Sequence, residues 1–218
     1  MKKINDSIRK HIIISSLLTL SPILVGLLLW KRLPEQIPTH FGFNGVADQY
    51  SSKAFSVFFM PLFFLFIHWI MIWGTSMDPK HEKVSDKIYT MIIYSVPIIC
   101  IFVTLTIYLK TLDQNFDITR AIMCLVSVIF IVIGNYLPKT RQNYTIGIKL
   151  PWTLEDPENW DKVHRLGGYL FVGAGLAMFI SLFLPGNTMV YVMIVSTILA
   201  AIIPVIYSYR LYRNKKAD

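Results

Sequence analysis

Histidines near acidic residues are the groups in this sequence best suited to acid–base or metal chemistry. His164 follows Glu158 and Asp161 and could pair with either acid, but no serine or cysteine nucleophile accompanies it. His40 and Asp48 could ligate a metal ion, although a zinc site needs more ligands than two. We therefore expect no enzyme activity, no cofactor and no metal. His40 and Asp48 are interpreted as solvated groups of an ordered loop, with a metal site as the alternative.

Membrane spans are the elements that must position these groups. Of the 218 residues, 54% are hydrophobic and 16% are charged, whereas about a quarter of a soluble domain is charged. All 21 basic and 13 acidic residues lie outside six stretches, each about long enough for a helix to cross a hydrocarbon core: Ile12 to Trp30, Ala54 to Thr75, Ile88 to Leu109, Ala121 to Leu137, Leu166 to Leu184 and Met189 to Tyr209. The pattern predicts an all-α polytopic membrane protein with six transmembrane helices and excludes a soluble globular enzyme.

The basic residues predict the orientation of these spans. If the spans alternate, four segments share one side of the membrane: the N-terminus, Met77 to Lys87, Pro138 to Arg165 and the tail from Arg210. They hold 16 of the 21 Lys and Arg residues, so both termini are predicted to be cytoplasmic. The net charge of +8 is divided among these short segments rather than gathered on one face, and we expect no direct binding to nucleic acid.

The spans themselves carry little titratable chemistry. His68 is the one span residue with an ordinary pKa near neutrality, and we interpret it as a neutral packing residue. Ion-coupled carriers keep charged groups at membrane depth, and none is present in these stretches. A transporter or facilitator for small amphipathic molecules or peptides, with a site around Pro61, Pro97 and His68, remains the alternative function.

Small residues in the fifth span predict a close helix contact. Gly173, Ala177 and Ser181 recur every four residues and so lie on one helix face. Packing inside the protein is the preferred interpretation, and a homodimer face is the alternative.

The segment between the first two spans, Lys31 to Lys53, is predicted to lie outside the cell and to contain a hairpin. Asn44-Gly45 suits a tight turn between two short strands, Thr39 to Phe43 and Val46 to Tyr50. Two strands alone are marginally stable, so we expect the hairpin to rest on the ends of the spans.

The cytoplasmic segment Pro138 to Arg165 contains more specified structure than a tether needs. Asp156-Pro157-Glu158 has the features of a helix start, and the helix would carry Trp160 and His164 towards the fifth span. Gly147 and Pro151 would shape a compact loop before it. Side chains suited to bonding irregular backbone occur nearby: Asn135, Asn143, Thr145 and Thr153.

These two segments resemble those of a known protein family. The first resembles the DUF1648 domain, with the pattern P-x-x-I-P-x-H-F…G…D…K at Pro34, Ile37, Pro38, His40, Phe41, Gly45, Asp48 and Lys53. The second resembles the signature of the SdpI family, G-N…N…G-I-K/R…P-W-T…W…H-R…G-G, at Gly134, Asn135, Asn143, Gly147, Ile148, Lys149, Pro151, Trp152, Thr153, Trp160, His164, Arg165, Gly167 and Gly168. The chain is similar to bacterial membrane proteins of the SdpI family.

The resemblance implies a function that composition and spacing alone do not show. It implies an integral protein of the bacterial cytoplasmic membrane that gives immunity to a secreted, membrane-active peptide toxin. A small helix-turn-helix repressor held at the membrane is a further implied partner. It also divides the chain into a DUF1648-like region, 1–76, and an SdpI-like region, 77–218.

The resemblance also suggests two sets of site residues. Binding of the toxin is expected in the outer loop, at Pro34, Pro38, His40, Phe41, Gly45, Asp48 and Lys53. Signalling to the partner is expected in the cytoplasmic loop, at Asn135, Asn143, Gly147, Pro151, Trp152, Thr153, Trp160, His164 and Arg165.

Overall fold

The computed structural model describes residues 6–42, 45–80, 84–184 and 188–217, and the chain divides into two compact units. The hairpin unit consists of Lys3–Gly74 and Tyr89–Leu125. The signature unit consists of Thr75–Ile88 and Val126–Asp218, together with Met1–Lys2. The division of the chain at residue 76 stays a prediction.

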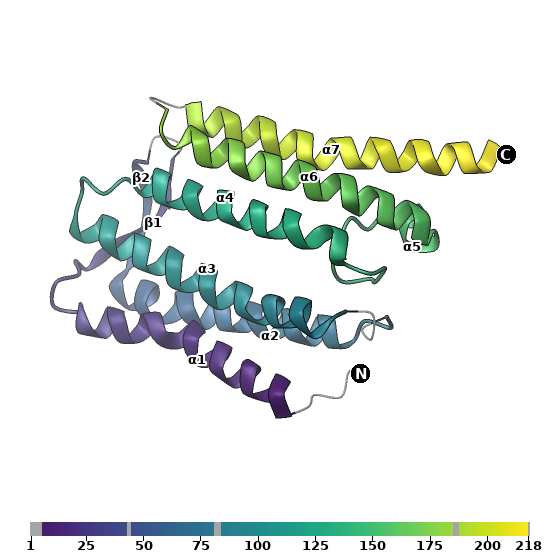
Figure 1. Cartoon of the computed structure of the whole chain (residues 1–218). Coiled ribbons are helices and arrows are strands. Elements are labelled where there is room, and N and C mark those ends of the chain that lie inside the picture. The colour runs from purple at the N-terminus through teal and green to yellow at the C-terminus, as the bar shows by residue number, and fades with distance from the viewer. Residues whose placement is uncertain (1–5, 43–44, 81–83, 185–187, 218) are drawn as a thin grey trace. The chain divides into compact units, whose positions relative to one another are not determined.

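Long apolar helices form most of the described chain (Figure 1). Within the described residues, six helices are long and apolar enough to cross a membrane. This confirms the predicted helical membrane fold. They are α1 (Asp6–Leu28), the π-helical turn η1 (Phe55–Phe59) continuing into α2 (Met60–Ser76), α3 (Asp86–Leu112), α4 (Ile118–Tyr136) with the 3-10 turn η3 (Leu137–Lys139), α6 (Pro157–Ser181) and α7 (Thr188–Ala217).

The segment between α1 and α2 forms the predicted hairpin. Strand β1 (Gln36–Phe41) pairs antiparallel with β2 (Ala47–Ser52). Gly45 has a φ of 72°, in the left-handed region that glycine adopts without strain. Asn44 of the predicted turn and Phe43, the predicted end of the first strand, lie outside the described residues. β1 begins earlier than predicted because Ile37, with none of its surface exposed, anchors the strand to the helices.

The hairpin rests on the ends of helices, as expected for a two-stranded sheet. Ile37 is part of a buried cluster, and Phe41 packs against it. The other buried members come from the turn after α1, from η1, from the end of α3 and from the start of α4: Leu33, Val57, Ile107, Tyr108 and Ile118. These helix ends therefore fix the orientation of the sheet.

Polar contacts join the helices of the hairpin unit in its interior. The Ser15 hydroxyl lies 2.9 Å from Nε2 of His68, which is completely buried. Nδ1 of His11 lies 3.0 Å from the hydroxyl of Tyr94. His68 therefore occupies a helix contact between α1 and α2, as the packing interpretation expects.

Glycines bring α4 and α6 together in the signature unit. A Cβ at Gly134 would lie 2.6 Å from the backbone nitrogen of Val172, and a Cβ at Gly168 would lie 2.8 Å from the carbonyl oxygen of Gly134. By contrast, Gly173 and Ala177 are exposed, and a Cβ at Gly173 would meet no described atom within 4 Å. The prediction that these two residues make the close internal contact is therefore wrong, because a different face of α6 meets α4. The homodimer alternative stays a prediction.

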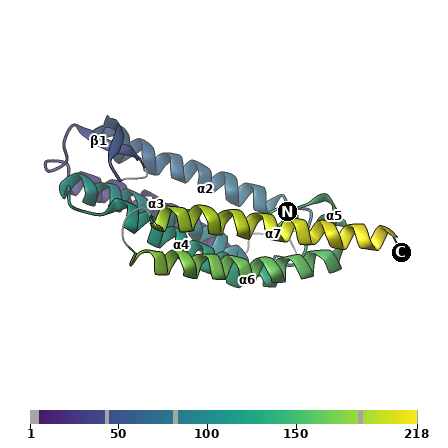
Figure 2. The same cartoon turned by 90° about the horizontal axis from the view of Figure 1, so that it is seen from above.

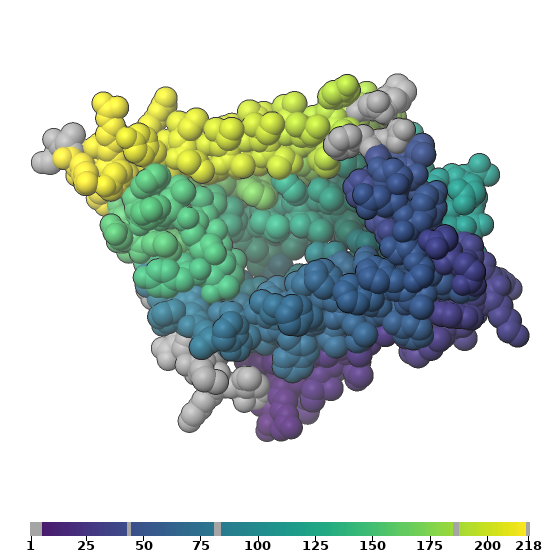
Figure 3. All heavy atoms as spheres, turned by 180° about the vertical axis from the view of Figure 1, so that it is seen from behind, coloured from purple at the N-terminus to yellow at the C-terminus, as the bar shows by residue number. Residues whose placement is uncertain are grey.

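α6 and α7 lie side by side in the signature unit (Figures 1 and 2). Figure 3 shows the outer surface of α7, coloured from light green to yellow, as a continuous row of side chains. Apolar residues along this helix are exposed, among them Tyr191, Val195, Ile198, Ile202 and Ile206. Such a surface suits the acyl chains of a bilayer, in which a helix satisfies its own backbone hydrogen bonds.

Candidate functional site

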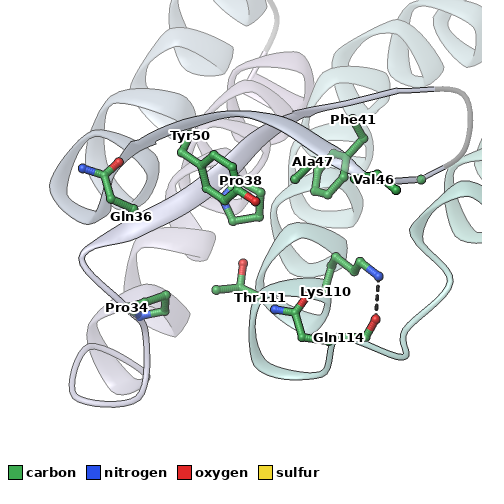
Figure 4. Close-up of a pocket in the computed structure, with 11 residues that line it drawn as sticks. Pro34, Gln36, Pro38, Phe41, Val46, Ala47, Tyr50, Lys110, Thr111 and Gln114 are labelled. Atoms are coloured by element: carbon green, nitrogen blue, oxygen red, sulfur yellow. Dashed lines mark hydrogen bonds between the residues drawn. The ribbon is translucent and has the colours of Figure 1, made fainter.

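Four of the seven residues predicted to bind ligand line one cavity beneath the hairpin. Figure 4 shows this cavity between the sheet and the end of α3. Its volume is about 250 Å³. The predicted residues Pro34, Pro38, Phe41 and Gly45 contribute to its walls. Residues that the sequence did not single out complete it: Gln36, Val46, Ala47, Tyr50, Lys110, Thr111 and Gln114.

His40 and Asp48 form an exposed pair across the hairpin rather than part of the cavity wall. Nδ1 of His40 lies 2.6 Å from Oδ1 of Asp48, and the side chains are 60% and 53% exposed. In the described part of the chain, no group of three His, Cys, Asp or Glu residues could hold a metal ion. The pair lies on strands that are neighbours, and it can help to hold the two strands in register.

Lys53 is buried beneath the end of the hairpin and does not line the cavity. Its ammonium group donates to the carbonyl oxygens of Trp30, at 3.2 Å, and Leu33, at 3.1 Å. It also pairs with the Glu35 carboxylate at 2.8 Å and lies 5.0 Å from the centroid of the Trp30 ring. Lys53 thus satisfies carbonyl groups where α1 ends, which is a role in positioning the hairpin.

Residues of the second motif, together with Thr140, form a cluster that we call the signature core. Its buried members are Thr140, Thr153, Trp160 and His164, and its partly buried members are Gly147 and Ile148. The imidazole of His164 donates from Nδ1 to the carbonyl oxygen of Trp160 at 2.8 Å and accepts from the backbone N–H of Ile148 at Nε2, at 3.0 Å. Its ring stacks on Trp160 with centroids 3.8 Å apart. The Trp160 indole donates to the carbonyl oxygen of Thr140 at 2.8 Å. Both nitrogens of His164 are engaged in its neutral form.

Gly147 lets the loop approach this histidine. Its φ is 119°, and a Cβ would lie 2.3 Å from Nε2 of His164. Four residues later the short helix α5 (Pro151–Glu155) begins, with proline at its first position. The Thr153 hydroxyl accepts from the backbone N–H of Leu150 and lies 2.9 Å from the carbonyl oxygen of Ile148. Glycine and threonine therefore shape the loop around His164.

Asp78 and Gln142 hold the same loop and were missed by sequence reasoning. The Asp78 carboxylate accepts from the backbone N–H groups of Lys80 and Tyr144, at 2.8 and 2.9 Å, and from the Thr145 hydroxyl, at 2.6 Å. Gln142 donates to the carbonyl oxygens of residues 153 and 154. An Asp-Pro dipeptide such as Asp78-Pro79 favours a turn, but no local pattern can show a partner 66 residues away.

The hydrogen bonds to Asp78 change its acidity. Burial raises the pKa of the carboxyl group, but hydrogen bonds from the Thr145 hydroxyl and the backbone N–H groups of Lys80, Tyr144 and Thr145 outweigh it. The pKa of Asp78 therefore lies below its ordinary value. The ionised form is favoured in the folded loop.

Trp152 connects α5 to α7 through a second cluster. Its indole donates to the Ser208 hydroxyl at 2.8 Å, and that hydroxyl donates to Oδ1 of Asn159 at 2.7 Å. The Asn159 amide returns a hydrogen bond to the Ser208 carbonyl oxygen at 3.0 Å. Trp152 also stacks on Tyr212, with ring centroids 5.4 Å apart. Sequence reasoning identified Trp152 but missed Asn159 and Ser208.

Four predicted signalling residues stay outside these clusters: Asn135, Asn143, Pro151 and Arg165. Asn135 is exposed and accepts from Lys139 at 3.3 Å, and Arg165 is exposed. Asp156 caps α6 as predicted, by accepting from the backbone N–H of Glu158 at 3.0 Å. A hydrogen bond from Lys215 is the main cause that lowers the pKa of Asp156. The proposed acid–base partners of His164 make no hydrogen bond to its ring, whose nitrogens are occupied by backbone groups.

The signature core and the cavity under the hairpin differ in the polar groups that they offer to a ligand. The polar groups of the signature core form hydrogen bonds with one another, which suits rigid positioning of a loop. The cavity under the hairpin instead combines an apolar wall with accessible polar groups, which suits ligand binding.

Comparison with known proteins agrees with the motifs in both segments. Residues 139–208 match the SdpI/YfhL protein family, and residues 17–65 match the domain of unknown function DUF1648. The chain is 26% identical over 205 residues to the immunity protein SdpI of Bacillus subtilis strain 168, covering 94% of this chain and 97% of that protein. No solved structure matches the chain significantly. The chain is therefore a multi-pass membrane protein that is similar to the SdpI immunity protein, with a match to DUF1648 preceding a match to the SdpI/YfhL family.

Proposed function

We propose that the chain is a non-enzymatic immunity protein of the bacterial cytoplasmic membrane, which gives resistance to a secreted, membrane-active peptide toxin. The observation that carries this proposal is the similarity to an immunity protein over nearly the full length of both chains. The structure supports a binding role over a catalytic one, because the buried signature residues form hydrogen bonds with one another and offer no free group for a reaction. His164, the best candidate for acid–base chemistry, has both ring nitrogens occupied.

The toxin meets the hairpin on the outer side of the membrane. The excess of Lys and Arg in the segments expected on the other side supports this orientation. The cavity supports the hairpin as the binding element, because four residues of the DUF1648-like pattern contribute to it. The exposed His40–Asp48 pair and the buried Lys53 support the hairpin around that cavity.

The cytoplasmic loop carries the signal, in this proposal, to a small helix-turn-helix repressor. Coupling requires the toxin to bind two arrangements of the protein with different affinities. Trp152 supports a role in this step because it joins α5 to α7, so a shift of α7 would reach the loop directly. The exposed basic residues of the loop would then present a changed surface to the partner: Lys139, Arg141 and Lys149.

Expression of the chain in a sensitive bacterium is expected to protect it from at least one secreted peptide of a panel. The Tyr50→Ala variant should lower protection by about tenfold, the effect of losing ~1.4 kcal/mol from an aromatic anchor. Tyr191→Ala is the matched control, because this exposed tyrosine lies on α7. Growth inhibition would be measured at equal amounts of protein in the membrane. Equal killing with and without the wild-type chain across the panel would contradict the proposal.

Replacing Trp152 with alanine is expected to impair signalling more than protection. In nanodiscs, the protective peptide should change tryptic cleavage at Lys139, Arg141 and Lys149 of the wild-type chain, as measured by mass spectrometry. The variant should keep protection in cells but lose most of that change, because its contacts with Ser208 and Tyr212 are gone. Trp69→Ala, at a half-exposed tryptophan of α2, is the control. A peptide-dependent change that survives in the Trp152 variant would remove this residue from the signalling route.

A further inference from the structure

The cavity under the hairpin is too small to enclose a whole small-molecule ligand. Its volume of about 250 Å³ is below the roughly 300–1,000 Å³ of pockets that enclose a small molecule. The sheet supplies a wall of Pro38, Phe41, Ala47 and Tyr50 side chains, as Figure 4 shows. This wall is apolar and aromatic. It suits a single large side chain, such as one residue of a peptide.

The floor of the cavity adds positive charge and hydrogen-bond donors. Lys110 is the one charged residue among those that line it, and Thr111 and Gln114 lie beside it. The Lys110 ammonium donates to the carbonyl oxygen of Gln114 at 2.7 Å, which leaves two of its three donors for a ligand. An accessible ammonium group next to an apolar wall attracts an anionic group of a ligand.

Nearby carboxylates are occupied by other groups. Asp48 pairs with His40, and the Asp117 carboxylate pairs with Arg120 at 3.3 Å. The remaining acid close in sequence, Asp113, accepts from the backbone N–H of residue 115 at 2.9 Å. None of these acids lines the cavity. The charge of Lys110 is therefore available to a carboxylate of the ligand.

The sheet also offers a place for the rest of an extended peptide. In the described residues the sheet has two strands, so each strand has an edge without a strand partner. β1 contains Pro38, which has no N–H group to donate. β2 (Ala47–Ser52) contains no proline and is largely exposed. An extended peptide can add to such an edge by backbone hydrogen bonds.

We propose that the cavity binds the C-terminal residue of an extended peptide, with its apolar side chain against Tyr50 and Phe41 and its carboxylate on Lys110. The apolar wall selects the apolar side chain, and the ammonium group, which pairs with no carboxylate among the described residues, selects the terminal carboxylate. This inference rests on the proposed function in one respect, since it takes the peptide toxin as the natural ligand.

The test uses the full chain in nanodiscs of zwitterionic lipid and three acetylated hexapeptides as probes. One ends in phenylalanine with a free carboxylate, the second is its C-terminal amide, and the third is that amide with a glutamate at an internal position. Binding would be measured by calorimetry for the wild type, Lys110→Gln and Lys110→Arg. Lys31→Gln is the matched control, because this exposed lysine does not line the cavity.

The free-acid peptide is expected to bind the wild type about tenfold more tightly than its amide, which is the effect of one charge-assisted hydrogen bond. Lys110→Gln should abolish that difference, whereas Lys110→Arg and Lys31→Gln should keep it. Equal binding of acid and amide by the wild type would overturn the inference. Equally tight binding of the internal-glutamate amide would overturn the assignment to a peptide C-terminus.

Protection assays separate this inference from the proposed function. If wild-type cells are protected and Lys110→Gln protects equally well, the toxin does not use this contact, and the inference fails while the immunity function stands. If the wild type protects against no peptide but binds the free-acid probe through Lys110, the immunity function fails and the cavity assignment stands.

Discussion

Replacing Gly147 with alanine is expected to destabilise the signature unit by about 3 kcal/mol or more, because two costs combine. Gly147 has a φ of 119°, which residues with a side chain rarely adopt. The Cβ of an alanine at this position would lie 2.3 Å from Nε2 of His164. The loop must then move away and break the hydrogen bond from Ile148 to His164. The thermal midpoint of the protein in detergent should fall, and trypsin should cut faster at Lys149.

Gly173→Ala provides the control for this substitution. It adds the same methyl group to an exposed site where no atom of the described residues lies within 4 Å of the new Cβ. Alanine is also the better helix former, by about 1 kcal/mol in an exposed helix. This variant should melt at or slightly above the wild-type temperature. A Gly147→Ala variant that melts and is cleaved like the wild type would show that the close approach to His164 does not hold the loop.

Replacing Asp78 with alanine is expected to cost about 2–3 kcal/mol at neutral pH, because buried donors lose a charged acceptor. The Thr145 hydroxyl and the backbone N–H of Tyr144 would be left without this partner. The measurement is the thermal midpoint in detergent, compared with the wild type. Asp113→Ala is the control, since its carboxylate accepts from the backbone N–H of Asn115 on an exposed loop.

The contribution of Asp78 also has a defined pH dependence. Its pKa in the folded protein is lowered, so the stabilisation is fully present above the unfolded value of about 4 and is lost as pH falls through the folded pKa. The difference in midpoint between the wild type and Asp78→Ala should therefore be large at pH 7 and should shrink below about pH 4. A difference that stays constant down to pH 3 would assign the effect to packing rather than to the carboxylate.

The signature residues divide into those that build the loop before α6 and those that remain exposed. Trp160 and His164 are almost completely buried and bonded within the signature core. Arg165 and Lys149 are exposed and are better placed to meet another molecule. Substitutions in the buried set should therefore lower the amount of folded protein before they reveal a role in signalling.

The segment between α1 and α2 shows how local patterns predict an element without predicting which of its residues line the cavity. Turn chemistry and two short strand patterns predicted the hairpin, because these depend on neighbouring residues. The DUF1648-like pattern, however, contained residues with three different locations. Pro38 lines the cavity, His40 pairs on the surface, and Lys53 binds carbonyl groups at the end of α1. Lys110 completes the cavity from a helix more than 50 residues further along the chain.

The sequence by itself determined the six apolar helices, the hairpin, the helix start at Asp156 and the resemblance to the SdpI family. Each of these depends on hydrophobicity or on residues close together in the chain. Only the tertiary structure showed that Asp78 holds the 143–145 turn, that Ser208 binds Trp152, and that Lys110 lies beneath the hairpin. Such contacts join side chains far apart in sequence. Their geometry follows from how helices pack, and the order of residues along one segment does not contain it.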